Sequence, residues 1–161
     1  MSQRARPQPK SGPDAQLIAE YTAAFGPADE DLVCELIDVK CKFLGGEADD
    51  WSPQVLDELL YEVYPAQVIA DPEDLTKIPG VAAQLMRVLA KRSPGRRAEL
   101  EELAGATEKM TKPFSDEMND KGNWSPGKRV WSAAEAEGVD FDDPAAIARW
   151  MEGFNQRSRE E

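Results

Sequence analysis

Histidine is missing from all 161 residues of the chain. Its absence excludes a Ser-His-Asp or Cys-His catalytic triad, histidine-ligated zinc, an HExxH site and a histidine pH switch, because each needs an imidazole. The glycines are isolated or stand at predicted helix ends, so no glycine-rich phosphate loop is present. No serine lies in a G-x-S-x-G setting. We therefore expect no catalytic residue, no cofactor and no metal, and a non-catalytic role is favoured over an enzyme.

Cysteine and long apolar runs are also scarce. The two cysteines, Cys34 and Cys41, lie two turns apart on a predicted helix, about 10 Å along its axis, which is too far for a disulfide. No stretch approaches the roughly 18 apolar residues of a membrane span. The basic N-terminus is not followed by the apolar run of a signal peptide. These features predict a cytoplasmic protein without a membrane segment.

Alternating strand patterns are missing too, whereas helix signals recur along the chain. Leu17, Ile18, Tyr21 and Phe25 fall on one helical face. A polar residue followed by proline is a typical helix start, with the polar residue as N-cap and the proline in the first turn. This pair occurs at Ser52-Pro53, Asp71-Pro72, Ser93-Pro94, Ser125-Pro126 and Asp143-Pro144. The sequence therefore predicts an all-α fold, a compact orthogonal bundle of about 6–8 helices without a sheet.

The predicted organisation has three parts. Residues 1–13 are rich in Pro, Gln, Ser and Arg and form a flexible basic tail. Residues 14–156 form one helical domain, which could divide into subdomains 14–92 and 93–156. Residues 157–161 are expected to fray at the C-terminus.

Three local expectations follow from the same patterns. Pro79 is expected to open a helix. Residues 106–123 are mostly polar and are expected to form a long connection with at most a helical turn. The last helix is expected to turn four apolar side chains inward, those of Ile147, Trp150, Met151 and Phe154.

Acidic residues outnumber basic ones by 31 to 19, which gives a net charge of −12. The charge is segregated, because residues 14–78 contain 16 acidic and 3 basic residues, whereas residues 79–97 contain five basic residues and no acidic one. The five form a candidate interaction patch: Arg87, Lys91, Arg92, Arg96 and Arg97. They could pair with the acidic part of the chain, contact a protein partner or bind phosphate. Direct nucleic-acid binding is disfavoured, because no aromatic residue interleaves them and the rest of the chain repels phosphate.

Two of the four tryptophans, Trp51 and Trp124, stand directly before Ser-Pro helix starts. At that position an apolar side chain typically packs back onto the new helix as a hydrophobic staple. The alternative is that they are exposed aromatic anchors of a binding surface.

A short acidic run, Asp140 to Asp143, precedes the last predicted helix. Closely spaced carboxylates suit a hard cation such as Ca²⁺ or Mg²⁺. An aspartate N-cap and extra negative charge are, however, favoured at a helix start in any case. The sequence therefore favours capping over a cation site.

Several of these motifs together resemble a protein family. They are the Trp51-Ser52-Pro53 start, the Ile78-Pro79 step, Trp124-Ser125-Pro126-Gly127-Lys128, Gly138-Val139-Asp140 and Phe154-Asn155. The combination is similar to uncharacterised helical proteins of high-GC Gram-positive bacteria, over roughly residues 45–156. The resemblance implies an all-helical fold and a bacterial cytoplasmic setting, and it carries no activity. The chain departs from that pattern at Ala66-Gln67, where the family has a basic pair, which puts an anion-binding role for this turn in doubt.

Three functional hypotheses follow from the sequence. The first is an acidic helical interaction or regulatory module without catalytic activity, which binds a protein partner through an acidic face. The second is a small-ligand-binding protein or enzyme with a tryptophan-lined pocket between two helical halves. The third is an inhibitor that mimics nucleic-acid charge toward a basic partner. The sequence predicts nothing about oligomeric state.

Overall fold

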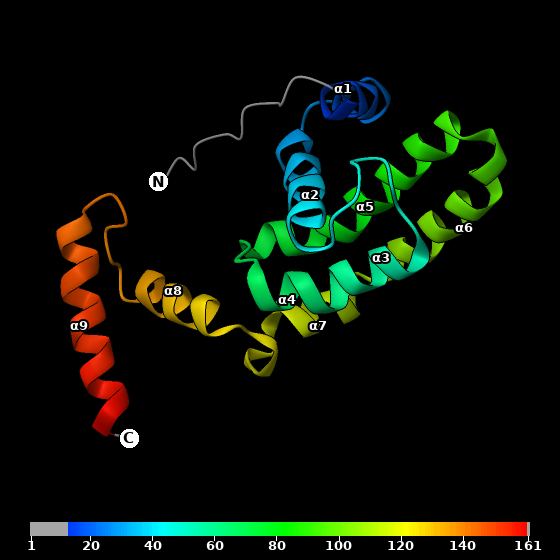
Figure 1. The fold of residues 1–161 in the computed structure, drawn as a ribbon. Coiled ribbons are helices and arrows are strands. Elements are labelled where there is room, and N and C mark those ends of the chain that lie inside the picture. Colours follow the sequence, from blue (N-terminus) through cyan, green and yellow to red (C-terminus); the bar gives the residue numbers. More distant parts are fainter. Residues whose placement is uncertain (1–12, 161) are drawn as a thin grey trace.

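The computed structural model describes residues 13–160 (Figure 1). Its helices are α1 (Pro13–Phe25), α2 (Glu30–Phe43), α3 (Pro53–Glu58), α4 (Tyr64–Gln67), α5 (Pro72–Arg92), α6 (Arg97–Glu108), α7 (Thr111–Asn119), α8 (Pro126–Ala136) and α9 (Pro144–Glu160). A π-helical turn, Leu59–Val63, joins α3 and α4 into one helix, and short 3-10 turns precede α6 and α8. The described residues contain no strand, so the all-α prediction is confirmed. The predicted basic tail lies outside the described residues, except for Pro13.

The polar-proline pairs start helical segments as expected. Pro53, Pro72, Pro126 and Pro144 each begin an α-helix, and Pro94 begins the 3-10 turn before α6. Capping hydrogen bonds hold three of these starts: the Ser52 hydroxyl accepts from the Val55 N–H at 3.2 Å, the Ser125 hydroxyl from Lys128 at 3.1 Å and the Asp143 carboxylate from Ala145 at 3.0 Å. The capping interpretation of the acidic run before α9 is therefore supported by geometry.

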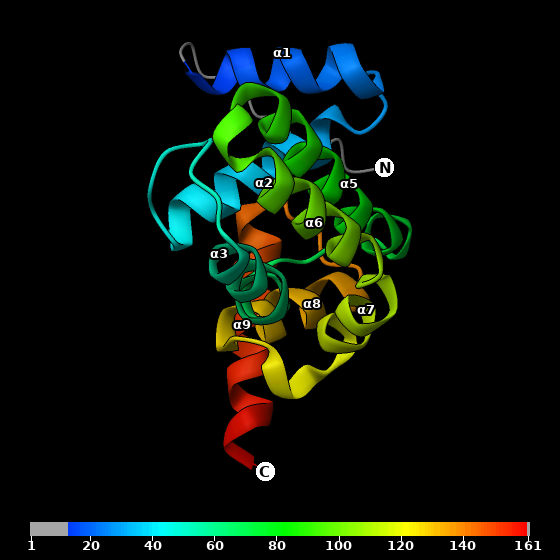
Figure 2. The same ribbon diagram turned by 90° about the vertical axis from the view of Figure 1, so that its right-hand side faces the viewer.

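Helix α5 is the centre of the molecule. Eleven of its 21 residues are buried, and it packs against α1, α2, α6 and α7. Figure 2 shows α1 lying across one end of the molecule while α5 and α6 run side by side. Small residues such as Ala82, Ala83 and Ala90 let neighbouring backbones approach, and Leu85 and Met86 fill the space between helices. We call helices α1–α7 the body.

The expectation that Pro79 opens a helix is wrong. Helix α5 begins at Pro72 and continues past Pro79, which is buried inside it. A proline in a helix interior removes one backbone hydrogen bond and costs about 3 kcal/mol. Burial of Leu75, Ile78 and Val81 on both sides of the proline outweighs this cost, because interrupting the helix would expose them.

Residues 106–123 are more helical than predicted. Helix α6 continues through Gly105 to Glu108, and α7 follows after a short turn. The sequence pattern was too weak to show α7, because only Phe114 and Met118 are apolar anchors. Both are buried in the core, so this segment packs on α5 and α4 and is not a surface connection.

Helices α8 and α9, which we call the arm, project from the body (Figure 1). Helix α9 has no buried residue between Pro144 and Arg159, so its four apolar side chains do not face a core as expected and are only half-buried. It is helical up to Glu160, including residues expected to fray. The sequence suggested a possible division into subdomains 14–92 and 93–156. The helices on the two sides of that boundary, α5 and α6, pack extensively against each other, whereas the chain leaves the body after α7.

No helix between residues 13 and 160 combines the length and the apolar character needed to cross a lipid bilayer. Cys34 and Cys41 are free and half-buried on α2, in agreement with the prediction of no disulfide between them. Burial, with nearby carboxylates, raises the pKa of the Cys34 thiol to about 11. A thiol of this kind is poorly nucleophilic at neutral pH.

The hydroxyl of Tyr64 is an unsatisfied polar group in the core. Tyr64 is fully buried beside Phe114, and its hydroxyl has no hydrogen-bond partner among the described residues. Replacing Tyr64 by phenylalanine should raise the free energy of unfolding by about 1 kcal/mol, because an unsatisfied buried hydroxyl is removed. Urea denaturation checks this, with Tyr21→Phe as the control. The Tyr21 hydroxyl donates to Gln84 at 2.6 Å, so its loss should instead destabilise; a destabilised Tyr64→Phe would contradict the prediction.

Candidate interaction surfaces

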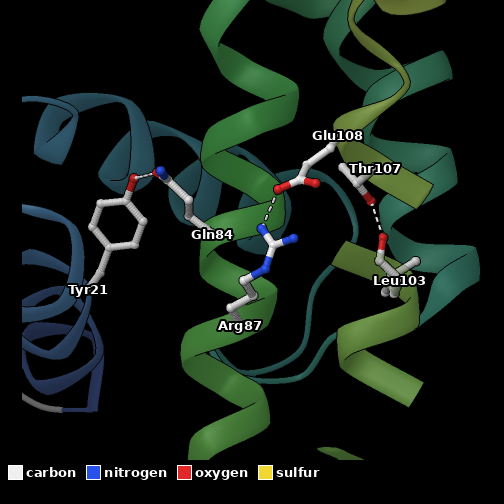
Figure 3. Close-up of polar contacts among 6 residues, drawn as sticks. All are labelled: Tyr21, Gln84, Arg87, Leu103, Thr107 and Glu108. Carbon is white, nitrogen blue, oxygen red and sulfur yellow. Dashed lines mark hydrogen bonds and ion pairs between the residues drawn. The ribbon is translucent and has the colours of Figure 1, made fainter. Parts of the chain in front are cut away.

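The basic segment is partly neutralised within the molecule. The Arg87 guanidinium on α5 pairs with the Glu108 carboxylate at the end of α6 (Figure 3). This contact holds the pKa of Glu108 below its usual range, through the hydrogen bond from Arg87. Arg92 pairs with Glu20 on α1 at 3.0 Å. Two of the five basic residues, Arg87 and Arg92, therefore link α5 to α6 and to α1 by ion pairs.

Arg96 is also engaged. Its guanidinium donates to the Trp51 backbone carbonyl at 2.6 Å and pairs with Glu99 on α6 at 3.2 Å. Lys91 and Arg97 are exposed and have no hydrogen-bond or ion-pair partner among the described residues. The structure thus favours intramolecular pairing for Arg87, Arg92 and Arg96, and only two bases remain available to a partner.

Trp51 is a core residue. Its side chain is 1% exposed, and its indole N–H donates to the Ala48 carbonyl at 2.7 Å. The ammonium of Lys40, which is itself buried, lies 5.7 Å from the Trp51 ring centre and donates to the Glu47 carbonyl at 2.7 Å. Gly46, with φ of +75°, brings the loop backbone close to this ammonium. Trp51 and Lys40 together hold the loop between α2 and α3. The helical spacing places Lys40 on the apolar face of α2, but the expectation that its ammonium extends to water is wrong, because the ammonium is buried and bound to the Glu47 carbonyl.

Trp124 lies at the junction between body and arm and is half-buried. Its indole N–H donates to the Met118 carbonyl near the end of α7 at 2.8 Å. The ammonium groups of Lys121 and Lys128 lie 6.0 and 5.0 Å from its ring centre. The ring is therefore covered by two lysines, and its role is to hold the junction together.

The same junction caps the C-terminal end of α4. The Ser125 N–H donates to the Ala66 carbonyl at 3.0 Å, and the buried Lys128 ammonium donates to the Pro65 carbonyl at 2.7 Å. Carbonyls in the last turn of a helix lack intrahelical partners and carry the negative end of the helix dipole. Burial lowers the pKa of Lys128 to about 8. A backbone N–H and a cation from one short segment thus attach the arm to the body.

A groove runs beside α2, on the acidic part of the chain. It has a volume of about 400 Å³ and is lined by Glu35, Asp38, Val39, Lys42, Phe43, Gln67, Val68 and Ile69. Asp31, Glu35 and Asp38 are spaced four and three residues apart, so they form one row along α2. The Phe43 side chain is 41% exposed at the end of this helix. The Lys42 ammonium lies 5.1 Å from the Phe43 ring centre, so the surface combines an acidic row with a partly exposed aromatic ring and one base.

A second groove of about 340 Å³ lies between α3 and α6. It is lined by Pro53, Gln54, Leu56, Asp57, Leu103, Ala106, Thr107 and Met110. Neither groove contains a tryptophan, and four of the eight residues that line the α2 groove are charged or polar. The tryptophan-lined pocket expected under the second hypothesis gains no support from these two grooves.

The arm carries two pairs of aromatic side chains. Trp131 and Phe141 are 45% and 40% exposed, and their ring centres are 5.2 Å apart. Trp150 and Phe154, four residues apart on α9, stack at 4.9 Å. The Trp150 indole N–H donates to the Glu137 carboxylate at the end of α8. The sequence reading placed the α9 pair in a core, whereas the structure leaves it near the surface.

The acidic run before α9 acts as a turn and a cap. The Asp140 carboxylate accepts from the Asp142 N–H at 2.9 Å, and Asp143 caps the helix. Among residues 13–160, no group of three or more cysteine, aspartate or glutamate side chains is arranged to hold a metal ion.

A scan against protein-family models, a search of curated proteins and a search of solved structures each found no match for this chain. The resemblance to helical proteins of high-GC Gram-positive bacteria stays a prediction. The functional argument therefore rests on the surfaces described above.

Proposed function

We propose that the protein is a non-catalytic interaction protein that binds a basic protein partner through the exposed face of α2. The observation that carries this proposal is the groove of about 400 Å³ in which acidic side chains stand beside the exposed Phe43 ring. Asp31 and Asp38 are exposed and form no ion pair with any described residue, so their charge is available to a partner. The proposal keeps the cytoplasmic location expected from the sequence.

The shape and charge of this surface suit an amphipathic helix with basic residues. An apolar side chain of the partner would enter the groove against Val39 and Phe43, and lysine or arginine side chains would face Asp31 and Asp38. The wider acidic stretch, residues 14–78, adds long-range attraction that raises the association rate. Binding should therefore weaken as salt concentration rises.

The first test uses a fluorescent synthetic helical peptide built of leucine and lysine. The double variant Asp31→Lys/Asp38→Lys should bind it at least about 10-fold more weakly than the wild-type protein at low salt, because two attractive contacts become repulsive. Fluorescence polarisation at increasing salt measures this. The matched control is Glu101→Lys/Glu102→Lys on α6, which changes the net charge equally at exposed positions outside the groove.

Equal losses in both double variants would show attraction to overall charge and would contradict a site on α2. Phe43→Ala is a second test that changes no charge. It should weaken binding of the peptide at any salt concentration, because an apolar contact is lost. Wild-type protein and the α2 double variant can then be used as paired baits in native lysate, where the natural partner is the protein retained only by the wild type.

A further inference from the structure

Helix α9 presents an apolar row that the rest of the described chain covers only in part. The row consists of Ile147, Trp150, Met151 and Phe154, and none of them is buried. Helix α9 itself is set away from the body, as Figure 1 shows. An isolated helix of this length is marginal in water, and most helices in proteins are stabilised by packing an amphipathic face. Packing this row against a partner surface would therefore stabilise α9.

We infer that this surface is α9 of a second copy of the chain, packed antiparallel across a two-fold axis. The inference is independent of the basic partner proposed for α2. It is motivated by the spacing of the row. The intervals between its successive residues are three, one and three, so the pattern is the same in both chain directions. A two-fold axis between Trp150 and Met151 brings Ile147 of one copy against Phe154 of the other, and Trp150 against Met151. A two-fold interface must be self-complementary in this way.

The charges at the two ends of α9 support the antiparallel direction. Asp142 and Asp143 stand at its N-terminal end, whereas the last turn contains Arg157 and Arg159 together with Glu160. In the antiparallel pairing, Asp142 of one copy lies level with Arg159 of the other. A parallel pairing would place like charges together, which is unfavourable.

The charged groups already make contacts within one copy, and these are weak. Arg157 pairs with Glu137 at 3.4 Å and Arg149 pairs with Asp143 at 3.9 Å. All four side chains are largely exposed, and exposed pairs contribute about 0–1 kcal/mol each. These contacts can therefore exchange for contacts with a second copy at little cost.

The first experiment measures the mass in solution by sedimentation equilibrium from about 5 to about 500 µM, the range in which a small interface associates. Wild-type protein should form a dimer within this range. Met151→Lys places a charge beside the two-fold axis and should raise the dissociation constant at least about 100-fold. The matched control is Gln156→Lys on the opposite, exposed face of α9, which should dimerise as the wild type does. A monomer throughout the range, or equal behaviour of the two lysine variants, would overturn the inference.

The second experiment tests the direction of pairing in a Cys34→Ser/Cys41→Ser background. Ile147→Cys and Phe154→Cys proteins are mixed and oxidised, and each is also oxidised alone. The mixture should give a disulfide-linked dimer while each variant alone does not, because antiparallel pairing joins these positions only between different variants. Crosslinking of Ile147→Cys with itself would indicate a parallel pairing and would overturn the proposed geometry. The α2 variant Asp31→Lys/Asp38→Lys should dimerise normally, so failure of one proposal leaves the other testable.

Discussion

Replacing Trp51 by alanine should lower the free energy of unfolding by about 3–5 kcal/mol, the usual cost of truncating a buried tryptophan. The side chain is 1% exposed, and its loss would also leave the Ala48 carbonyl without its indole donor. The Lys40 ammonium would lose the aromatic face that lies 5.7 Å away. Since a domain of this size is typically stable by about 5–15 kcal/mol, one substitution should remove a large share of the total.

Urea denaturation followed by far-UV circular dichroism measures this effect without depending on tryptophan fluorescence. The control is Trp131→Ala, which removes the same side chain at a position that is 45% exposed. Its effect should stay within about 1 kcal/mol. Similar losses in the two variants would contradict the assignment of Trp51 to the core.

Replacing Lys128 by alanine should cost about 2–3 kcal/mol, because the Pro65 carbonyl then loses its donor in a buried position. The loss should be local. Hydrogen exchange should become faster in α8, whereas the central helix α5 should stay protected at the level set by global unfolding. The Glu135 side chain on α8 is exposed, so Glu135→Ala is the control and should leave the exchange of α8 nearly unchanged. Uniform loss of protection over the whole chain would contradict a local role.

The contribution of Lys128 should also depend on pH. Its pKa is about 8 in the folded protein, against an ordinary value of 10.5. Between these pH values the unfolded chain holds a proton that the folded chain has released, so the Lys128 contribution to unfolding free energy increases as pH rises. The stability gap between wild type and Lys128→Ala should widen from about pH 8 to about pH 10. Effects of Cys34 and Tyr21, whose pKa values are raised by burial, are present in both proteins and cancel; a constant gap would contradict the prediction.

Local signals predicted most of the helix starts and the inward faces of the body. A proline in the first turn acts through neighbouring residues only, so Ser52-Pro53 and Ser125-Pro126 could be read directly. Pro79 misled the prediction, because its local cost is outweighed by burial that depends on distant helices. The four apolar residues of α9 have the periodicity of a core helix, and periodicity alone does not show whether a body is present to cover them.

The interaction surfaces were less predictable than the helices. The sequence singled out the basic segment, but Arg92 pairs with Glu20, which is far from it in the sequence. Lys128 stood out in the sequence only as part of the Trp-Ser-Pro-Gly-Lys motif, and that motif did not show that the junction buries its ammonium. The acidic row on α2 could be read from helical spacing, whereas the groove beside it depends on Val68 and Ile69 coming close to α2.

The α2 groove and the apolar row of α9 share no residue, and they lie on different parts of the molecule, one on the body and one on the arm. Both can therefore be occupied at once. A pair of chains joined through α9 would offer two identical acidic faces to a partner. A partner with two basic segments would gain avidity from this arrangement, since its second contact would form at the high effective concentration created by the first.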